Sequence, residues 1–220
     1  MNIIIELNTA YNNFVDEEYA QTKKKAAKNP RILFEEGKGE KDLFLSCFSN
    51  FLKTIDKEES SYKKAKEHYS FTIEESFVLF FYTSIGSNRI NSSLSDNGYE
   101  NAPLYVKTYT KLLENVLGKL PSFNENEIIH ESSYSDLCKV LRKEWMTSPN
   151  TIRFPSFISS HKGEKWGNRP GYYIKILTSK KSRGKDITKI KANEQEVLFM
   201  TNTEFKILEV KGKKIRLEEI

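Results

Sequence analysis

Hydrophobic positions recur at helical spacing through the first half of the chain. They follow one another every three or four residues over about 7–28, 41–56 and 105–117. Apolar residues spaced in this way share one face of an α-helix. Thr72, followed three residues later by Glu75, forms a capping box that opens a strongly apolar helix, and residues 83–87 are predicted to end it. Residues 57–69 are polar and Lys-rich, which fits a charged helix or a linker.

After Pro121 the pattern changes to short apolar runs rich in β-branched and aromatic residues, which are typical of strands. The pair Lys211 and Gly212 predicts a hairpin turn between the last two of them. Helices followed by strands predict an α+β fold. The predicted strands cover residues 127–130, 151–160, 172–177, 196–200, 204–210 and 214–217.

Length and composition narrow the class of protein. The chain has 220 residues, of which 38% are hydrophobic, so it is long enough for a real core and is not predicted to be disordered. No apolar run approaches the ~18 residues that a membrane helix needs, and the first residues lack the features of a signal peptide. Cys47 and Cys138 are far apart and not in a metal-like spacing. We therefore expect a cytoplasmic protein without disulfides, zinc or a membrane partner.

Charge is distributed unevenly along the chain. Residues 151–220 hold 16 Lys and Arg against 8 Asp and Glu, whereas residues 1–150 hold 19 against 22. A basic C-terminal part indicates a phosphate-bearing partner, either a nucleotide or a nucleic acid. A general requirement for solubility would explain the same excess equally well.

Two carboxylates stand at the start of an apolar run near the C-terminus. Glu194 and Glu196 are two residues apart, so in an extended strand they would share a face about 7 Å from each other. Such a pair suits general-base and charge-stabilising work, although by itself it is more typical of a solvated strand end. No Gly-x-Gly-x-x-Gly, phosphate-binding loop or Ser-His-Asp order stands out, which disfavours hydride transfer and ATP-driven chemistry.

Four segments agree in order and spacing with a known family. They are Tyr82–Ser84 followed by Ile90 and Asn91, then Phe157–His161, then Glu194–Phe199 and Thr203–Val210. Together they resemble the mono-ADP-ribosyltransferases, the family of the C3- and VIP2-like toxins and of arginine-directed transferases. The family's motifs are an arginine, a Ser-Thr-Ser strand and an E-x-E pair. The resemblance covers about residues 71–220.

The resemblance implies a single domain over residues 1–220, with a helical lobe over about 1–120 and a split β-sandwich over about 121–220 that binds NAD. It implies NAD as a substrate and no metal. Glu196 would bind the 2′-hydroxyl of the nicotinamide ribose and oppose the developing positive charge, and Glu194 would orient or deprotonate the acceptor. The residues expected to bind NAD are His130, Phe157, Ser159, Ser160 and Arg169.

One position departs from the family. The arginine that ends its first core strand should fall within residues 127–131, where His130 is the best match. Three interpretations stay open at this point. The site uses His130, or another arginine such as Arg142 or Arg153 takes the role, or the chain is a degenerate transferase.

The function that follows is transfer of ADP-ribose from NAD to a macromolecule. RNA or DNA is slightly favoured over protein arginine because of the basic C-terminal part. Without a recognisable leader, the chain fits an intracellular toxin of a toxin–antitoxin or antiphage defence system, with an antitoxin protein as a partner. The alternatives are a degenerate binding module, a secreted or injected effector that modifies host protein, and hydrolysis of NAD alone.

Overall fold

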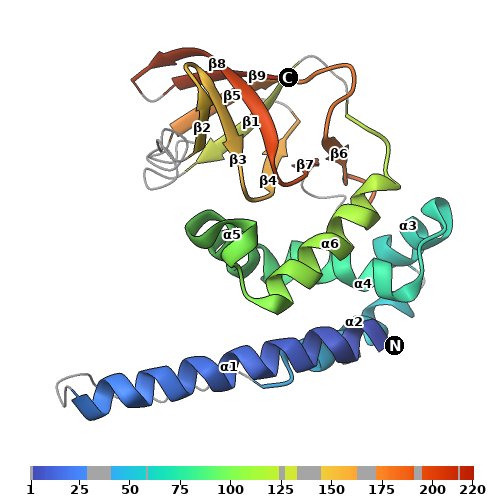
Figure 1. Ribbon diagram of the computed structural model, residues 1–220. Coiled ribbons are helices and arrows are strands. Elements are labelled where there is room, and N and C mark those ends of the chain that lie inside the picture. Colours follow the sequence, from blue (N-terminus) through green and yellow to red (C-terminus); the bar gives the residue numbers. More distant parts are fainter. Residues whose placement is uncertain are drawn as a thin grey trace.

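The computed structural model places a helical half beside a strand half, with the N-terminus in the first and the C-terminus in the second (Figure 1). It describes residues 2–28, 41–57, 59–123, 127–132, 145–162, 172–190, 195–212 and 214–220. This order of helices and strands is the α+β arrangement predicted from the sequence. None of the helices in these ranges is long and apolar enough to cross a membrane.

Among the described residues, the elements up to residue 118 are helices. The predicted helices are all present, the first begins earlier than the apolar spacing suggested, and the Lys-rich segment after residue 57 includes a helix of its own. In chain order they are α1 (Asn2–Lys28), α2 (Leu43–Ile55), α3 (Ser61–Tyr69), α4 (Ile73–Phe81), the π-helical segment η1 (Tyr82–Gly86), α5 (Ser87–Asn101) and α6 (Leu104–Gly118).

The start of α4 confirms the predicted capping box. The backbone N–H of Glu75 donates to the Thr72 hydroxyl at 3.1 Å, and the backbone N–H of Thr72 donates to the Glu75 carboxylate at 3.0 Å. Each bond satisfies a backbone donor that the first turn of a helix leaves without a partner.

The prediction that residues 83–87 end this helix is wrong. The chain continues through η1 into α5, and the hydroxyls of Thr83 and Ser84 donate to backbone carbonyls one turn earlier, at 2.8 and 2.7 Å. These bonds return hydroxyls to the helix rather than stopping it. At Gly86 a Cβ would lie 2.4 Å from the Phe81 ring, so only glycine fits there. A π-helical turn of this kind is often found at a functional site.

The strands of the described residues form one sheet in the order β2-β3-β8-β9-β5-β1-β4-β7-β6. Only β5 and β9 are parallel among the neighbours in this order. The bounds are β1 (Glu127–Ser132), β2 (Met146–Ser148), β3 (Thr151–Phe154), β4 (Ile158–His161), β5 (Tyr172–Leu177), β6 (Gly184–Asp186), β7 (Glu196–Phe199), β8 (Thr203–Lys211) and β9 (Lys214–Glu219).

Two details of the predicted strands are corrected. The run 151–160 is not one strand but two, because the chain bends around Pro155 and moves from the partner β8 to the partner β7. The three-residue strands β2 and β6 were not predicted, since segments so short carry no readable alternation. The hairpin turn at Gly212, where φ is 54°, is confirmed between β8 and β9.

Two hydrophobic clusters lie on opposite sides of the strands β4 and β7. The cluster that we name the helical core contains the buried faces of the helices and extends into the strand half through Phe157, Ile187, Ile190 and Leu198. The cluster that we name the sheet core lies inside the folded sheet and contains Ile158, Val197 and Phe199. Because side chains alternate along a strand, β7 contributes Leu198 to one core and its two neighbours to the other.

Hydrogen bonds also join the two halves. The Ser61 hydroxyl of α3 donates to the carbonyl of Ile190 at 2.6 Å. The hydroxyl of Thr201, just after β7, donates to the carboxylate of Glu114 in α6. These two bonds hold the chain against the helices both before and after Glu196 in the sequence.

Candidate active site

Glu196 lies at the seam between the helical half and the sheet. In the register of β4 and β7, His161 is paired with Glu196 and Ser159 with Leu198. Paired residues of neighbouring strands share a face, so Glu196, Ser159 and His161 lie on the side of the helical core. The Ser159 hydroxyl donates a hydrogen bond to the Glu196 carboxylate. Glu196 is 4% exposed, so this bond orients a carboxylate that is almost enclosed.

Tyr82 and Asn91 form the helical side of this seam. The side-chain N–H of Asn91 donates to the Tyr82 hydroxyl at 3.0 Å, and the backbone N–H of Phe157 donates to the other end of the Asn91 amide at 3.2 Å. The rings of Tyr82 and Phe157 meet edge to face, 5.4 Å apart. The start of β4 is thus fixed to η1 and α5 by a continuous chain of contacts.

The buried phenol of Tyr82 is influenced by the charge of Glu196. Burial raises the pKa of Tyr82 far above its usual range, the hydrogen bond from Asn91 opposes that rise, and the negative charge of Glu196 adds to it. The raised pKa keeps the phenol of Tyr82 protonated well above the range in which a tyrosine usually ionises, which favours a structural role in the wall of the seam.

Of the two serines predicted to bind NAD, the structure brings only Ser159 to Glu196. Ser160 is paired with Val197 and is fully buried on the side of the sheet core. Its hydroxyl has no hydrogen-bond partner among the described residues. Phe157 is 3% exposed and packs within the helical core. Ser160 therefore faces away from Glu196, whereas the contact of Phe157 with NAD stays a prediction.

The strand period does not extend back to Glu194. β7 begins at Glu196, and Gln195 has a left-handed backbone with φ of 42°. The expectation that both acids share one face of a strand rested on an extended chain through Gln195, and that premise is wrong. Glu194 itself lies outside the described residues, so its role as the residue that orients the acceptor stays a prediction.

The family's arginine position is only partly visible. The backbone register pairs His130 of β1 with Ile174 of β5, whereas Ile129 is the residue paired with His161. Outside the described part of the chain lie the side chain of His130 and the whole of Arg142 and Arg169. Arg153 is half exposed on β3 and binds the Glu204 carboxylate at 3.0 Å, on the opposite side of the sheet order from β7.

Tyr82 and Asn91 contributed to the family resemblance, but the sequence did not place them in the site. Their spacing of nine residues predicts no contact in a regular helix, and the π-helical turn between them was not foreseen. His161 was given no role, although strand alternation from Ser159 would have placed it on the same face. Among the described residues no group of three His, Cys, Asp or Glu side chains is arranged to hold a metal.

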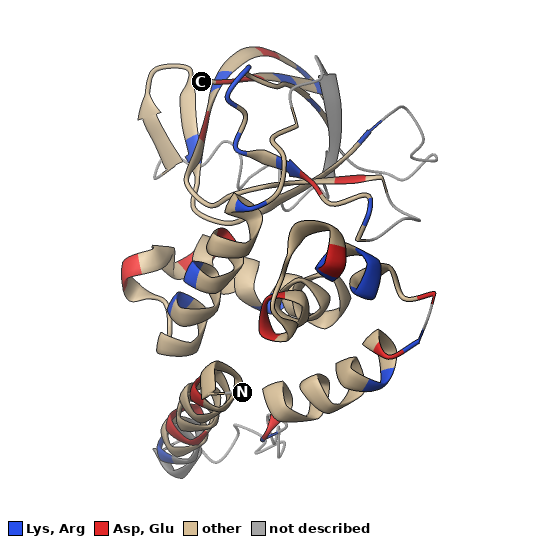
Figure 2. Cartoon of the chain, turned by 90° about the vertical axis from the view of Figure 1, so that its right-hand side faces the viewer, with Lys and Arg blue, Asp and Glu red and all other residues tan. Residues whose placement is uncertain are grey.

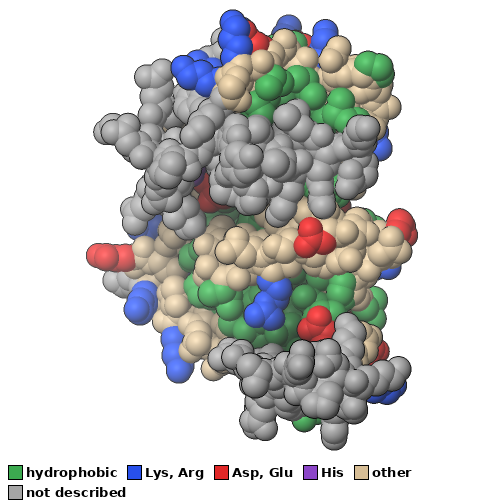
Figure 3. All heavy atoms as spheres, turned by 90° about the vertical axis from the view of Figure 1, so that its left-hand side faces the viewer, with side chains coloured by type: hydrophobic (Ala, Val, Ile, Leu, Met, Phe, Trp, Pro, Cys, Tyr) green, Lys and Arg blue, Asp and Glu red, His purple; other side chains and the backbone are tan. Residues whose placement is uncertain are grey.

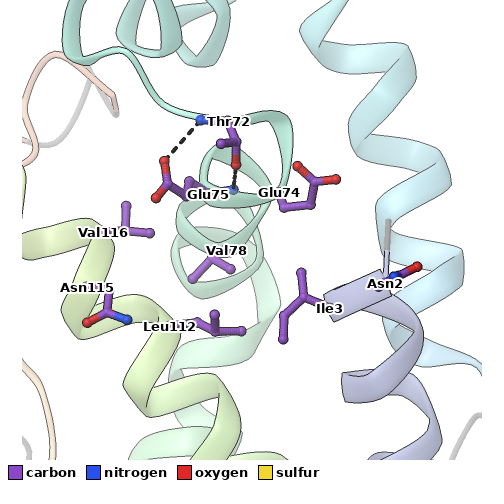
Figure 4. A pocket seen from close by; sticks show the side chains of 9 residues that line it. All are labelled: Asn2, Ile3, Thr72, Glu74, Glu75, Val78, Leu112, Asn115 and Val116. Atoms are coloured by element: carbon purple, nitrogen blue, oxygen red, sulfur yellow. Dashed lines mark hydrogen bonds between the residues drawn. The ribbon is translucent and has the colours of Figure 1, made fainter.

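Among the described residues, two cavities of the helical half are not lined by Glu196 or Ser159. One, of about 550 Å³, lies between α1, α4 and α6, where Figure 4 shows Glu75 turned back to its capping bond. The other, of about 810 Å³, lies between α1 and α5 and is lined by Arg89, which also contacts the Tyr11 hydroxyl. On the side shown in Figure 3, hydrophobic side chains gather over the helical half. These cavities carry none of the chemistry found at the seam.

Comparison with known proteins gives similarity of structure alone. No protein-family model and no curated protein sequence matches the chain. An ADP-ribosyltransferase toxin from Paenibacillus larvae is 18% identical over 73% of this chain and 94% of that chain, with a TM-score of 0.54. An ADP-ribosyltransferase from Clostridium botulinum is 19% identical over 72% of this chain and 89% of that chain, with a TM-score of 0.53.

A third solved structure is Exoenzyme S from Pseudomonas aeruginosa, in complex with human 14-3-3 protein beta and bound to Carba-NAD. It is 13% identical over 80% of this chain and 88% of that chain, with a TM-score of 0.54. Identities this low show the fold and leave the activity open. The α+β architecture predicted from the sequence is confirmed, and the chain has the fold of the ADP-ribosyltransferases.

Proposed function

We propose that this chain is a mono-ADP-ribosyltransferase that moves ADP-ribose from NAD to a macromolecule. The observation that carries the proposal is the hydrogen bond from Ser159 to the nearly enclosed Glu196, at the seam between the helices and the sheet. The similar structures named as ADP-ribosyltransferases support it through the shared fold.

The chemistry explains why one oriented carboxylate matters. Cleavage of the bond between nicotinamide and ribose leaves an oxocarbenium-like centre, and a carboxylate opposes the positive charge that develops. Glu196 supplies that carboxylate and binds the 2′-hydroxyl of the ribose. Ser159 holds it in one orientation before the reaction, so less reorganisation is needed in the transition state. Glu194 is proposed to act on the acceptor, and His130 and Arg169 to contact NAD.

The acceptor that we propose is RNA or DNA, with protein arginine as the alternative. The support is the excess of 16 basic over 8 acidic residues after residue 150. Figure 2 shows basic positions spread over several strands and loops of the strand half. Such a surface attracts a polyanion without requiring a specific sequence. In this proposal the protein is a cytoplasmic toxin of a toxin–antitoxin or antiphage defence system and is neutralised by an antitoxin protein.

Labelled NAD tests the activity. The wild-type protein is incubated with NAD that is labelled in its adenylate part and with a cell lysate, beside the variant Glu196→Gln. We expect label in macromolecules with the wild type and a loss of about 100-fold or more with the variant, because removal of a single preorganised charge-stabilising group typically costs that much. Glu100→Gln, which removes an exposed carboxylate on α5, is the matched control and should be neutral.

The outcomes separate the hypotheses. If the wild type labels nothing and releases no ADP-ribose, the chain is not an active transferase and a binding module becomes the better interpretation. Free ADP-ribose without labelled macromolecules would instead indicate hydrolysis of NAD. Treatment of the labelled material with nuclease or with protease then identifies the acceptor class, and label that resists nuclease but is released by protease would contradict the nucleic-acid acceptor.

A further inference from the structure

A row of basic residues crosses the sheet and ends at Glu196. The strand register pairs Arg216 of β9 with Lys175 of β5, Lys175 with Ile129 of β1, Ile129 with His161 of β4, and finally His161 with Glu196 of β7. Residues paired in this way stand side by side on the same face. Four neighbouring strand spacings separate the ends of the row, which corresponds to about 19 Å.

Burial shows which face of the sheet carries the row. The residues on either side of Lys175 along β5, Ile174 and Ile176, are buried in the sheet core. The residues on either side of Arg216 along β9, Ile215 and Leu217, are buried there too. Lys175, Arg216 and His161 therefore stand on the outer face, the one that carries Ser159 and Glu196. Lys175 and His161 are half-buried and Arg216 is exposed.

The row has no cation on β1, where the family resemblance predicts an arginine. Its β1 position is Ile129, and the basic residues come from the strands on either side of β1, Lys175 from β5 and His161 from β4. Each of the basic residues in the row also makes an interaction with another residue. Arg216 lies next to Glu209 of β8, whose pKa is lowered first by its bond to Lys211 and also by Arg216. The charge of Arg216 is thus partly balanced. Lys175 lies one strand nearer to Glu196 than Arg216 does, so the inference rests on Lys175.

We propose that Lys175, supported by His161, binds the diphosphate of the dinucleotide. This inference rests on the proposed function, because it assumes that the nicotinamide ribose lies at Glu196. A lysine presents a flexible point charge, which holds a phosphate without the two parallel bonds that an arginine makes. The dinucleotide then extends from Glu196 across β4 and β1 to β5, along the outer face of the sheet.

Calorimetric titration of the full chain tests the proposal. ADP-ribose has the diphosphate and no nicotinamide bond to cleave, whereas nicotinamide riboside has no phosphate. Lys175→Met keeps most of the length of the side chain and removes its charge. We expect it to weaken ADP-ribose binding by about 10-fold or more, the usual effect of losing a charge-assisted bond, and to leave nicotinamide riboside unaffected. Lys175→Arg should restore most of the affinity.

Two further variants sharpen the test. Lys206→Ala removes an exposed lysine on β8 and should leave the affinity for ADP-ribose unchanged. Arg216→Gln should weaken ADP-ribose binding by a smaller factor than Lys175→Met does.

Raising the salt concentration should weaken ADP-ribose binding by the wild type more than by Lys175→Met, because salt screens the charge that the variant has lost. A merely structural role of Lys175 would not change the salt dependence.

The failure of this inference is distinguishable from the failure of the proposed function. If Lys175→Met folds and loses no more affinity than Lys206→Ala, while Glu196→Gln abolishes transfer, the diphosphate is bound elsewhere and the transferase assignment stands. If the wild type binds neither NAD nor ADP-ribose, both are overturned. Equal losses of affinity for ADP-ribose and nicotinamide riboside would also overturn the inference, since they would show damage to the whole site.

Discussion

The strands β4 and β7 separate the helical core from the sheet core. They present different kinds of side chain to the two cores. Toward the sheet core the side chains are apolar, apart from the buried hydroxyl of Ser160. Toward the helical core, Leu198 is accompanied by Glu196 and Ser159, which are joined by a hydrogen bond. One face is built for packing and the other combines packing with an oriented charge.

This difference shows how a nearly enclosed carboxylate is tolerated. A buried charge is costly unless hydrogen bonds compensate for it, and the side of the helical core supplies such a bond at Glu196 and further polar contacts at Tyr82 and Asn91. The sheet core, closed on itself, offers Ser160 no partner among the described residues. A charged, hydrogen-bonded site therefore fits at the seam between the helical half and the sheet, and not inside the sheet core.

The largest expected effect comes from truncating either core at β7. Phe199→Ala should destabilise the fold by about 3–5 kcal/mol and Leu198→Ala by about 2–5 kcal/mol, since both side chains are fully buried. We propose that the two halves are one domain, because Leu198 and Phe157 from the strand half belong to the helical core. Thermal unfolding followed by far-ultraviolet circular dichroism should show one transition that both variants lower. Two separate transitions, each lowered by one variant, would contradict this proposal.

The second effect concerns the link between η1, α5 and β4. Asn91→Ala removes the bond to the Tyr82 hydroxyl and leaves the backbone N–H of Phe157 without its acceptor. An unpaired buried group typically costs about 1–3 kcal/mol, and transferase activity should fall as well because β4 carries Ser159. Ser92→Ala, at an exposed neighbouring position, is the control. Chemical denaturation measures the stability difference, and equal stability of the two variants would refute the role of Asn91.

The third effect separates the two serines of β4. Ser159→Ala removes the bond to Glu196 and should lower the rate of ADP-ribose transfer by about 10-fold. It should also lower the stability by about 1–3 kcal/mol, because a nearly enclosed carboxylate loses a hydrogen-bond donor. Ser160→Ala should leave the rate unchanged and leave the stability equal or higher, because it removes a buried hydroxyl that lacks a partner among the described residues. Initial rates and melting temperatures of both variants check the pair. A larger loss of rate in Ser160→Ala than in Ser159→Ala would reverse the assignment of the two faces.

The smallest effect lies at the edge strand β6, where Asp186 binds Lys162 at 2.5 Å. Burial by itself would raise the pKa of Asp186, but hydrogen bonds from Lys162 and Thr188 outweigh burial and lower it below 3.8. A lowered pKa in the folded state stabilises the protein above the unfolded-state pKa, and that stabilisation is lost as the pH falls through the folded-state value.

Asp186→Asn should therefore be less stable than the wild type at pH 7, by about 1 kcal/mol or less for a partly exposed pair. The difference should shrink as the pH falls below 3.8 and vanish where the wild-type carboxyl is protonated. Denaturation series at pH 7 and near pH 3 measure it. A difference that grows toward acid pH would contradict the sign of the shift.

Much of the architecture followed from patterns in the sequence. Apolar spacing located the helices, the capping box at Thr72 and Glu75 located the start of α4, and alternation located most of the strands. The errors have identifiable causes. Residues 83–87 resembled a helix end because Ser, Thr and Gly favour caps and turns, and the π-helical turn instead uses the hydroxyls to bond backward. The bend at Pro155 divides a run that alternation alone treats as one strand.

The sequence by itself determined that helices precede strands, that Glu196 opens an apolar strand, and that the basic residues gather after residue 150. Local propensity and side-chain period carry this information because each depends on residues close together in the chain. Tertiary structure alone decided that Ser159 and not Ser160 meets Glu196, that Tyr82 and Asn91 fix β4 to the helices, and that Lys175 shares a row with Glu196. Register between distant strands sets these relations, and a shift of one residue would exchange the faces.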